Sequence, residues 1–285
     1  MEAACETMPN VQSDEVRMKK KNRYERLLEA IFLAHFSEGK EGFEFQRKEM
    51  EDHAKRLKIR LPKNLGDLIY SFRYRVPLPQ SVQSHAPKGK KWLIRAAGMS
   101  RYRFVATAMP LQIVPSRMLA EIKVPDATPG VVLMYALDDE QALLAKLRYN
   151  RLIDLFTRVN CYSLQSHLRT TVPGLGQVET DELYVGVDRN GAHYVFPVQA
   201  KGPREKLNLV QIEQDMELCR HKYPGLVCRP IGAQFLEDGP IVLYEFAEAD
   251  DGVRILLEKH YRLTAPDLLT DKDLEEYKKA SSIEE

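Results

Sequence analysis

Apolar positions in the first hundred residues follow the spacing of short helices and then of two strands. Leucine, isoleucine and phenylalanine recur every three or four positions over 23–36 and again over 62–75, where Asn64 is suited to begin the helix. Residues 47–57 are highly charged and predict another helix between these two. Residues 90–108 predict two strands around an Ala-Ala-Gly-Met-Ser turn.

The second half of the chain has a different pattern, in which helices alternate with pairs of strands. A long helix comes first, and two strands follow that are joined through Asp-Arg-Asn-Gly, where Asn-Gly favours a tight hairpin turn. A further helix and two more strands complete an α-β-β-α-β-β order, which predicts an α/β domain with a mixed central sheet. These elements span residues 139–156, 178–187, 192–201, 208–223, 226–236 and 239–247.

The two patterns divide the chain. Three helices followed by a hairpin are typical of a winged helix-turn-helix, whose third helix enters the major groove of DNA. We therefore expect an N-terminal winged-helix domain followed by an α/β domain. The expected units are a disordered lead-in over 1–22, the winged helix over 23–108, a junction over 109–135, the α/β domain over 136–266 and a charged tail over 267–285.

The net charge of +1 conceals a difference between the two halves. Residues 1–122 carry 23 lysines and arginines against 14 aspartates and glutamates, whereas residues 123–285 carry 19 against 27. A basic first half indicates a module that faces phosphate groups, and asparagine and arginine are residue types that read base edges. The DNA contacts predicted on the third helix and the hairpin are Lys63, Asn64, Arg73, Arg75, Arg95, Arg101 and Arg103.

Composition places the chain among globular proteins, because its residues are 44% hydrophobic and 29% charged. No apolar run is long enough to cross a membrane, and the N-terminus lacks the apolar segment of a signal peptide. Cysteine spacing fits neither a zinc site nor a disulfide framework, so we expect reduced thiols and a cytoplasmic protein. The four cysteines are Cys5, Cys161, Cys219 and Cys228.

Gln199 and Lys201 stand out in the otherwise apolar strand predicted over 192–201. They lie two residues apart, so both side chains face the same side of the strand. Their neighbours depend on the register of the hairpin, because a slip of one residue turns every side chain to the other face.

Two registers are compatible with the hairpin sequence. A two-residue loop places Glu182 opposite the amide and Thr180 opposite the lysine, whereas a three-residue loop places Asp181 and Glu179 there. Either register brings a carboxylate to an amide and a lysine. Carboxylate and amide oxygens can hold Mg²⁺, and a lysine beside them can stabilise negative charge on a phosphate. The alternative is a structural salt bridge, with the amide bonded to backbone.

The order of an acidic residue, a hairpin, Gln199-Ala200-Lys201 and a helix resembles the PD-(D/E)xK nuclease superfamily, and its glutamine resembles the Mrr-like branch. The longer stretches 139–215 and 63–75 resemble bacterial type II restriction endonucleases, and the resemblance spans roughly 23–247. It implies a restriction-endonuclease-like α/β domain with Mg²⁺ as cofactor. The implied catalytic residues are Asp181, Glu182, Gln199 and Lys201, of which the first three are the implied metal ligands.

The choice between Asp181 and Glu182 stays open in the sequence. Glu182 directly precedes an apolar run, whereas aspartate is the residue type usual in the family. Gln199 departs from the common pattern, because a neutral ligand holds a cation less strongly than a carboxylate does. Glu179 is a further acid that could compensate.

Further candidates surround the predicted hairpin. His167 and Arg169 precede its first strand and are predicted DNA contacts, with a solvated loop as the alternative. Asp154, on the preceding helix, is a candidate outer metal ligand. Gln211 and Gln214, on the following helix, are candidates to line the cleft.

These observations predict an Mg²⁺-dependent, sequence-specific endonuclease that cleaves duplex DNA, has no membrane partner and acts beside a cognate DNA methyltransferase. Because a palindromic site has two-fold symmetry, we expect a homodimer. One alternative is a structure-specific or repair nuclease of the same fold. Another is a non-catalytic DNA-binding protein with a decayed nuclease domain.

Overall fold

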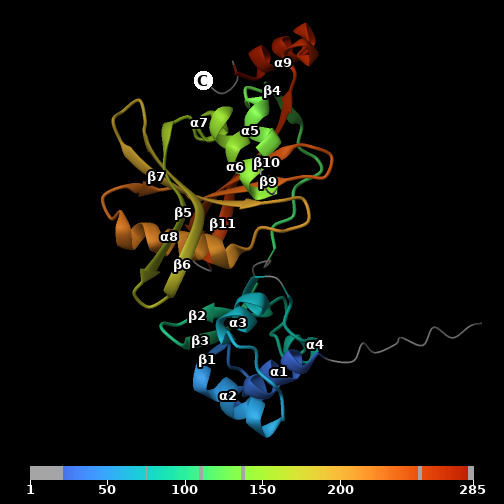
Figure 1. Ribbon diagram of the computed structural model, residues 1–285, viewed down its shortest axis with the longest axis vertical. Helices are drawn as coiled ribbons and strands as arrows, with labels where there is room; N and C mark the ends of the chain where they lie inside the picture. Colours follow the sequence, from blue (N-terminus) through green and yellow to red (C-terminus); the bar gives the residue numbers. More distant parts are fainter. Residues whose placement is uncertain (1–21, 75, 109–111, 136–138, 250–251, 282–285) are drawn as a thin grey trace, which may run out of the picture.

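The computed structural model describes residues 22–74, 76–108, 112–135, 139–249 and 252–281 (Figure 1). The predicted lead-in, apart from Asn22, and Arg75 therefore lie outside the described residues. The part described is a mixed α/β protein with a small antiparallel three-stranded sheet and a large mixed central sheet. Within it, no helix is both long enough and apolar enough to cross a membrane.

The N-terminal part packs its helices on the small sheet, whose strand order is β1-β3-β2. Asn22 begins the first helix by accepting a hydrogen bond from the Tyr24 amide, and Glu25 bonds back to the Asn22 amide. Phe32, Trp92 and Phe104 are buried at the centre. The elements are α1 (Arg23–His35), β1 (Gly42–Gln46), α2 (Arg47–Arg56), α3 (Leu65–Tyr74), α4 (Gln80–Gln83), β2 (Lys91–Ala96) and β3 (Arg101–Thr107).

The predicted helices and hairpin of this part are confirmed, and β1 and α4 are additional. β1 is only five residues long and lies directly before α2, so its alternation is too short to stand out in the sequence. A short turn separates it from α1, and it pairs antiparallel with β3.

The large sheet has the order β4-β11-β10-β9-β7-β6-β5, with β8 beside β7. Helices α6 and α7 cover one face, and α8 covers the other. Its elements are β4 (Glu121–Pro125), α5 (Gly130–Tyr135), α6 (Asp139–Tyr149), α7 (Leu152–Thr157), β5 (Asn160–Val172), β6 (Gly176–Val187), β7 (His193–Lys201), α8 (Leu209–Lys222), β8 (Val227–Cys228), β9 (Ile231–Phe235), β10 (Ile241–Ala249) and β11 (Gly252–Thr264); η1 (Pro266–Leu268) and α9 (Asp271–Ser281) follow.

Several elements of this part differ from the prediction. The helix expected over 139–156 is broken at Arg151, which has a left-handed backbone with φ of +50°. The polar segment before β6 forms the edge strand β5, which lacks apolar alternation because most of its side chains are exposed. The expected junction contains β4 and α5, and β4 pairs parallel with the unpredicted strand β11.

The N-terminal part and the part built on the large sheet have separate hydrophobic cores. One core is built from residues between Leu27 and Ala106, and the other clusters are built from residues between Ile113 and Tyr261. Polar contacts connect α3 with α8, which lies on the side of the large sheet nearer the N-terminal part (Figure 1). Cys161 and Cys219 are packed in the cores of the large part as small apolar residues, in agreement with the prediction.

Candidate functional site

The hairpin of β6 and β7 has the three-residue register. Val187 pairs with His193 and Glu182 with Val198, so Asp181 comes opposite Gln199. The Asp188 carboxylate selects this turn by accepting hydrogen bonds from the amides of Asn190 and Ala192, both at 2.9 Å. Of the two registers left open by the sequence, the structure therefore has the one that favours Asp181.

Asp181 and Lys201 come together where β6 and β7 separate. The Asp181 Oδ2 accepts a hydrogen bond from the Ala200 amide at 2.7 Å and lies 3.5 Å from the Lys201 Nζ. Both side chains are only 12% exposed, so the pair is screened from bulk water. Burial raises the pKa of Asp181 above its ordinary value, although Lys201 and the Ala200 amide oppose this shift.

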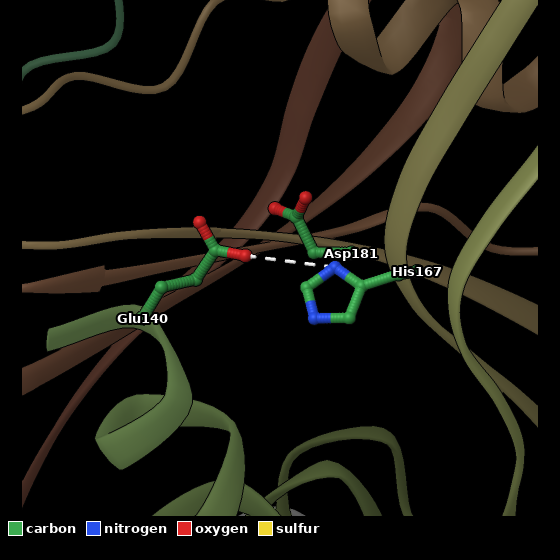
Figure 2. Close-up of side chains that lie close together, drawn as sticks. All are labelled: Glu140, His167 and Asp181. Atoms are coloured by element: carbon green, nitrogen blue, oxygen red, sulfur yellow. Dashed lines mark ion pairs between the residues drawn. The ribbon is translucent and has the colours of Figure 1, made fainter. Parts of the chain in front are cut away.

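Glu140 and His167 approach the same carboxylate from two other elements (Figure 2). Glu140 lies in the first turn of α6, and its Oε1 is 3.9 Å from the Nδ1 of His167 on β5. One ligand atom from each of Glu140, His167 and Asp181 lies within 4.8 Å of the other two. Two carboxylates and an imidazole at this spacing are suited to bind a divalent cation.

Glu182 lies on the other face of β6, because neighbouring residues of a strand alternate. Its side chain is fully buried, and its Oε1 is bound by Arg148 Nη2 at 2.8 Å and by the Ser163 hydroxyl at 2.5 Å. The structure therefore does not bring Glu182 to Lys201. Asp154 is also apart from the cluster, since it lines a pocket with Val187, the last residue of β6, whereas Asp181 lies in the middle of that strand.

Gln199 is held by α8. Its Nε2 donates hydrogen bonds to Asp215 Oδ2 at 2.9 Å and to the Glu179 carbonyl at 3.1 Å, while its Oε1 accepts one from Gln211 at 3.2 Å. Burial raises the pKa of Asp215 well above its usual range. The predicted residue Gln211 thus lies beside Gln199, whereas Asp215 was not predicted.

The predicted DNA contacts fall into two groups. Lys63, Arg101 and Arg103 are exposed, and Asn64 is exposed while it caps α3 by accepting from the Gly66 amide at 3.0 Å. The second group has partners within the protein, and Arg75 lies outside the described residues. Arg95 forms an ion pair with Glu213, the Arg73 guanidinium lies over the ring of Tyr74, and Arg169 binds Glu179 at 2.7 Å.

A basic groove that was not predicted lies between α2 and α3. It has a volume of about 610 Å³ and contains one acid, Glu51, among five cationic side chains. The high charge of the predicted helix 47–57 was the only sequence feature that pointed to this groove. The groove itself forms because the fold places the end of α2 beside the start of α3. The cationic residues of this basic groove are Arg47, Lys55, Lys58, Arg60 and Lys63.

Comparison of the chain with models of protein families, with curated proteins and with solved structures finds no match. The resemblance to PD-(D/E)xK nucleases therefore stays an expectation from the sequence motif. Glu140 was missed by the prediction, although its position resembles that of Asp154: an acid on the helix that precedes the candidate strands.

Proposed function

We propose that this protein is a metal-dependent endonuclease that hydrolyses phosphodiester bonds of duplex DNA. The observation that carries the proposal is the pairing of Asp181 and Lys201 at 3.5 Å, on adjacent strands and beside Glu140 and His167. In the proposal, the small sheet and its helices are a winged-helix domain, and the large sheet belongs to a restriction-endonuclease-like domain.

Mg²⁺ is the cofactor that the sequence resemblance implies, and the carboxylates of Asp181 and Glu140 are oxygen donors of the kind that such a cation accepts. A bound divalent cation polarises a phosphoryl oxygen and activates a water molecule. Lys201 places its ammonium group beside Asp181, where it stabilises negative charge that develops on the phosphate. Asp181 and the Ala200 amide hold this arrangement on a rigid strand.

The basic groove supports duplex DNA as the substrate. Its cations, together with exposed Arg101 and Arg103, offer charge to the phosphate backbone, and Lys63 among them lies at the start of α3. The proposal includes sequence-specific cleavage of the type II restriction kind, a homodimer at a palindromic site and a companion DNA methyltransferase, as the sequence resemblance implies.

The decisive experiment is incubation of the full chain with plasmid DNA and Mg²⁺ or Mn²⁺, followed by sequencing of the fragment ends. Lys201→Ala is expected to lower cleavage at least about 100-fold while duplex binding changes little, because the lysine acts on charge that develops in the transition state. Lys272→Ala on α9 is the matched control that removes a cation outside both the candidate site and the basic groove.

Each outcome separates the proposed nuclease from its alternatives. Recurrent ends at one sequence support a restriction enzyme, and cleavage confined to branched DNA supports a structure-specific or repair nuclease. Duplex binding without cleavage in either metal supports a non-catalytic protein, an alternative that the engagement of Gln199 by α8 favours. Cleavage by Lys201→Ala at the wild-type rate would contradict the proposed mechanism.

A further inference from the structure

We infer that the cation site consists of Asp181, Glu140 and His167, and that its imidazole nitrogen makes it select Mn²⁺ over Mg²⁺. This differs from the ligand set implied by the sequence motif, which contains Glu182 and Gln199. The inference rests on the proposed function in so far as both place a cation at Asp181.

The amide of Gln199 is already oriented by its neighbours. Two acceptors, Asp215 Oδ2 and the Glu179 carbonyl, face its Nε2, so the nitrogen must point toward them. Its only potential ligand atom, Oε1, accepts the hydrogen bond from Gln211. In this arrangement Gln199 joins β7 to α8 and holds the strand of Lys201, which is a positioning role.

His167 is directed to the cluster by an unusual backbone. Its φ is +49°, a left-handed value that is uncommon for a residue with a side chain. Ser166 pairs with Glu182 and Leu168 with Thr180, so His167 lies opposite Asp181 without joining the ladder itself. Such a backbone is retained where the surrounding structure over-determines it, and in this strand it coincides with the approach of the imidazole to two carboxylates.

A surface ion pair between Glu140 and His167 does not explain the cluster. Asp181 is buried, and its carboxylate lies within 4.8 Å of the ligand atoms of both residues, so two carboxylates and an imidazole converge at a point that opens to the surface. Lys201 offsets the charge of one carboxylate at 3.5 Å. A bound dication would interact with both carboxylates and accept the imidazole lone pair, which an ammonium group cannot do.

The donor set selects among cations. Mg²⁺ takes oxygen ligands and gives up its water reluctantly, so an imidazole nitrogen adds little to its binding. First-row transition dications accept imidazole, and Mn²⁺ also accepts carboxylates readily. Two carboxylates and one imidazole therefore favour Mn²⁺ over Mg²⁺.

The test measures Mn²⁺ and Mg²⁺ binding by calorimetry on the full chain without DNA, and electron spin-echo spectroscopy of bound Mn²⁺. We expect Mn²⁺ to bind at least about tenfold more tightly than Mg²⁺ and to show coupling to an imidazole ¹⁴N nucleus. His167→Asn removes the imidazole, and asparagine tolerates the left-handed backbone. It should abolish the nitrogen signal and lower Mn²⁺ affinity about tenfold, with Mg²⁺ affinity nearly unchanged. His193→Asn, at an exposed position of the same sheet, is the matched control.

Bound Mn²⁺ without nitrogen coupling in the wild-type protein would overturn the inference, and this result does not depend on a variant that folds. Equal affinities for Mn²⁺ and Mg²⁺ would overturn it as well. Failure of the proposed function gives a different result: nitrogen-coupled Mn²⁺ with no cleavage of any DNA removes the nuclease and retains the cation site. Cleavage with limiting Mn²⁺ that His167→Asn leaves unchanged retains the nuclease and removes His167 from its cation site.

Discussion

The hydroxyl of Tyr74 donates a hydrogen bond to Oε1 of Gln214 at 2.6 Å, and this bond joins the last residue of α3 to α8. The next residue of α8, Asp215, accepts a hydrogen bond from Gln199. The helix predicted to read DNA is thus connected to Gln199 on β7 through two hydrogen bonds, which involve the neighbouring residues Gln214 and Asp215 of α8. Arg95 and Glu213 form an ion pair in the same interface.

The hydrogen bond between Tyr74 and Gln214 predicts a loss of stability at alkaline pH. Burial raises the pKa of Tyr74 from its ordinary 10 to about 12, because the buried phenolate is unfavourable. The neutral hydroxyl is therefore favoured in the folded state. Its contribution is fully present below about pH 10 and is lost as the pH rises toward 12, by about 2–3 kcal/mol of unfolding free energy in total.

Tyr74→Phe isolates this contribution in urea unfolding at pH 8 and pH 11. At pH 8 the variant should be about 1 kcal/mol less stable than the wild type, because one hydrogen bond is lost. At pH 11 the difference should shrink or reverse, since phenylalanine does not titrate while the other tyrosines are common to both proteins. A difference that is the same at both pH values would contradict a raised pKa for Tyr74.

The faces of β6 predict opposite consequences for its two adjacent acids. Glu182→Ala removes a buried carboxylate that is bonded to the half-exposed Arg148 and should cost about 2 kcal/mol of unfolding free energy, while cation affinity stays unchanged. Asp181→Asn should change stability by only about 1 kcal/mol and should abolish tight cation binding. Chemical unfolding and calorimetric titration of both variants check this. Loss of cation binding in Glu182→Ala, at a folded fraction equal to that of the wild type, would contradict the assignment.

The sequence was sufficient to place Gln199 and Lys201 on one strand face, because a period of two follows from strand geometry alone. The sequence could not decide whether Asp181 or Glu182 faces Gln199, because the answer depends on whether the hairpin loop has two residues or three. Asp188 decides the loop by binding two turn amides, a contact that no alternation pattern reveals.

The approach of Glu140 and His167 to Asp181 could not be predicted for a different reason. His167 belongs to the edge strand β5, whose exposed side chains show no apolar period, and its left-handed backbone has no sequence signal of its own. Glu140 is brought to the site only by the packing of α6 on the large sheet. Sequence motifs therefore identified the two central strands, and tertiary packing supplied the side chains around them.

Because Gln199 donates a hydrogen bond to the buried Asp215, we expect a carboxylate to be poorly tolerated at position 199. In Gln199→Glu the new carboxylate replaces a donor that lies 2.9 Å from a buried acid whose pKa burial already raises. Two such acids share a proton, so their folded-state pKa values lie above the unfolded ones and stability is lost as the pH rises above about 4. Gln199→Glu should therefore be less stable than the wild type at pH 8 and closer to it at pH 5.

Asp215→Asn provides the matching control for this substitution. In the double variant, the asparagine amide can donate to the new glutamate, so the single effects should not add, with a coupling of about 1–3 kcal/mol. Unfolding free energies of the four proteins at both pH values give the coupling directly. Strict additivity would show that the two side chains do not interact in solution.

The basic groove predicts a steep salt dependence for duplex binding. Each phosphate contact contributes a slope of about −0.9 in a plot of log affinity against log salt, so five cations weaken binding by about 10²–10³ between 50 and 200 mM salt. Arg60→Ala and Lys63→Ala should each lower affinity and reduce the slope by about 1, whereas Lys272→Ala on α9 should change neither. Fluorescence anisotropy with several duplex sequences distinguishes two roles: an equal loss for all sequences indicates a phosphate contact, and a loss confined to one sequence indicates base recognition. An unchanged slope in both groove variants would show that DNA binds elsewhere on the protein.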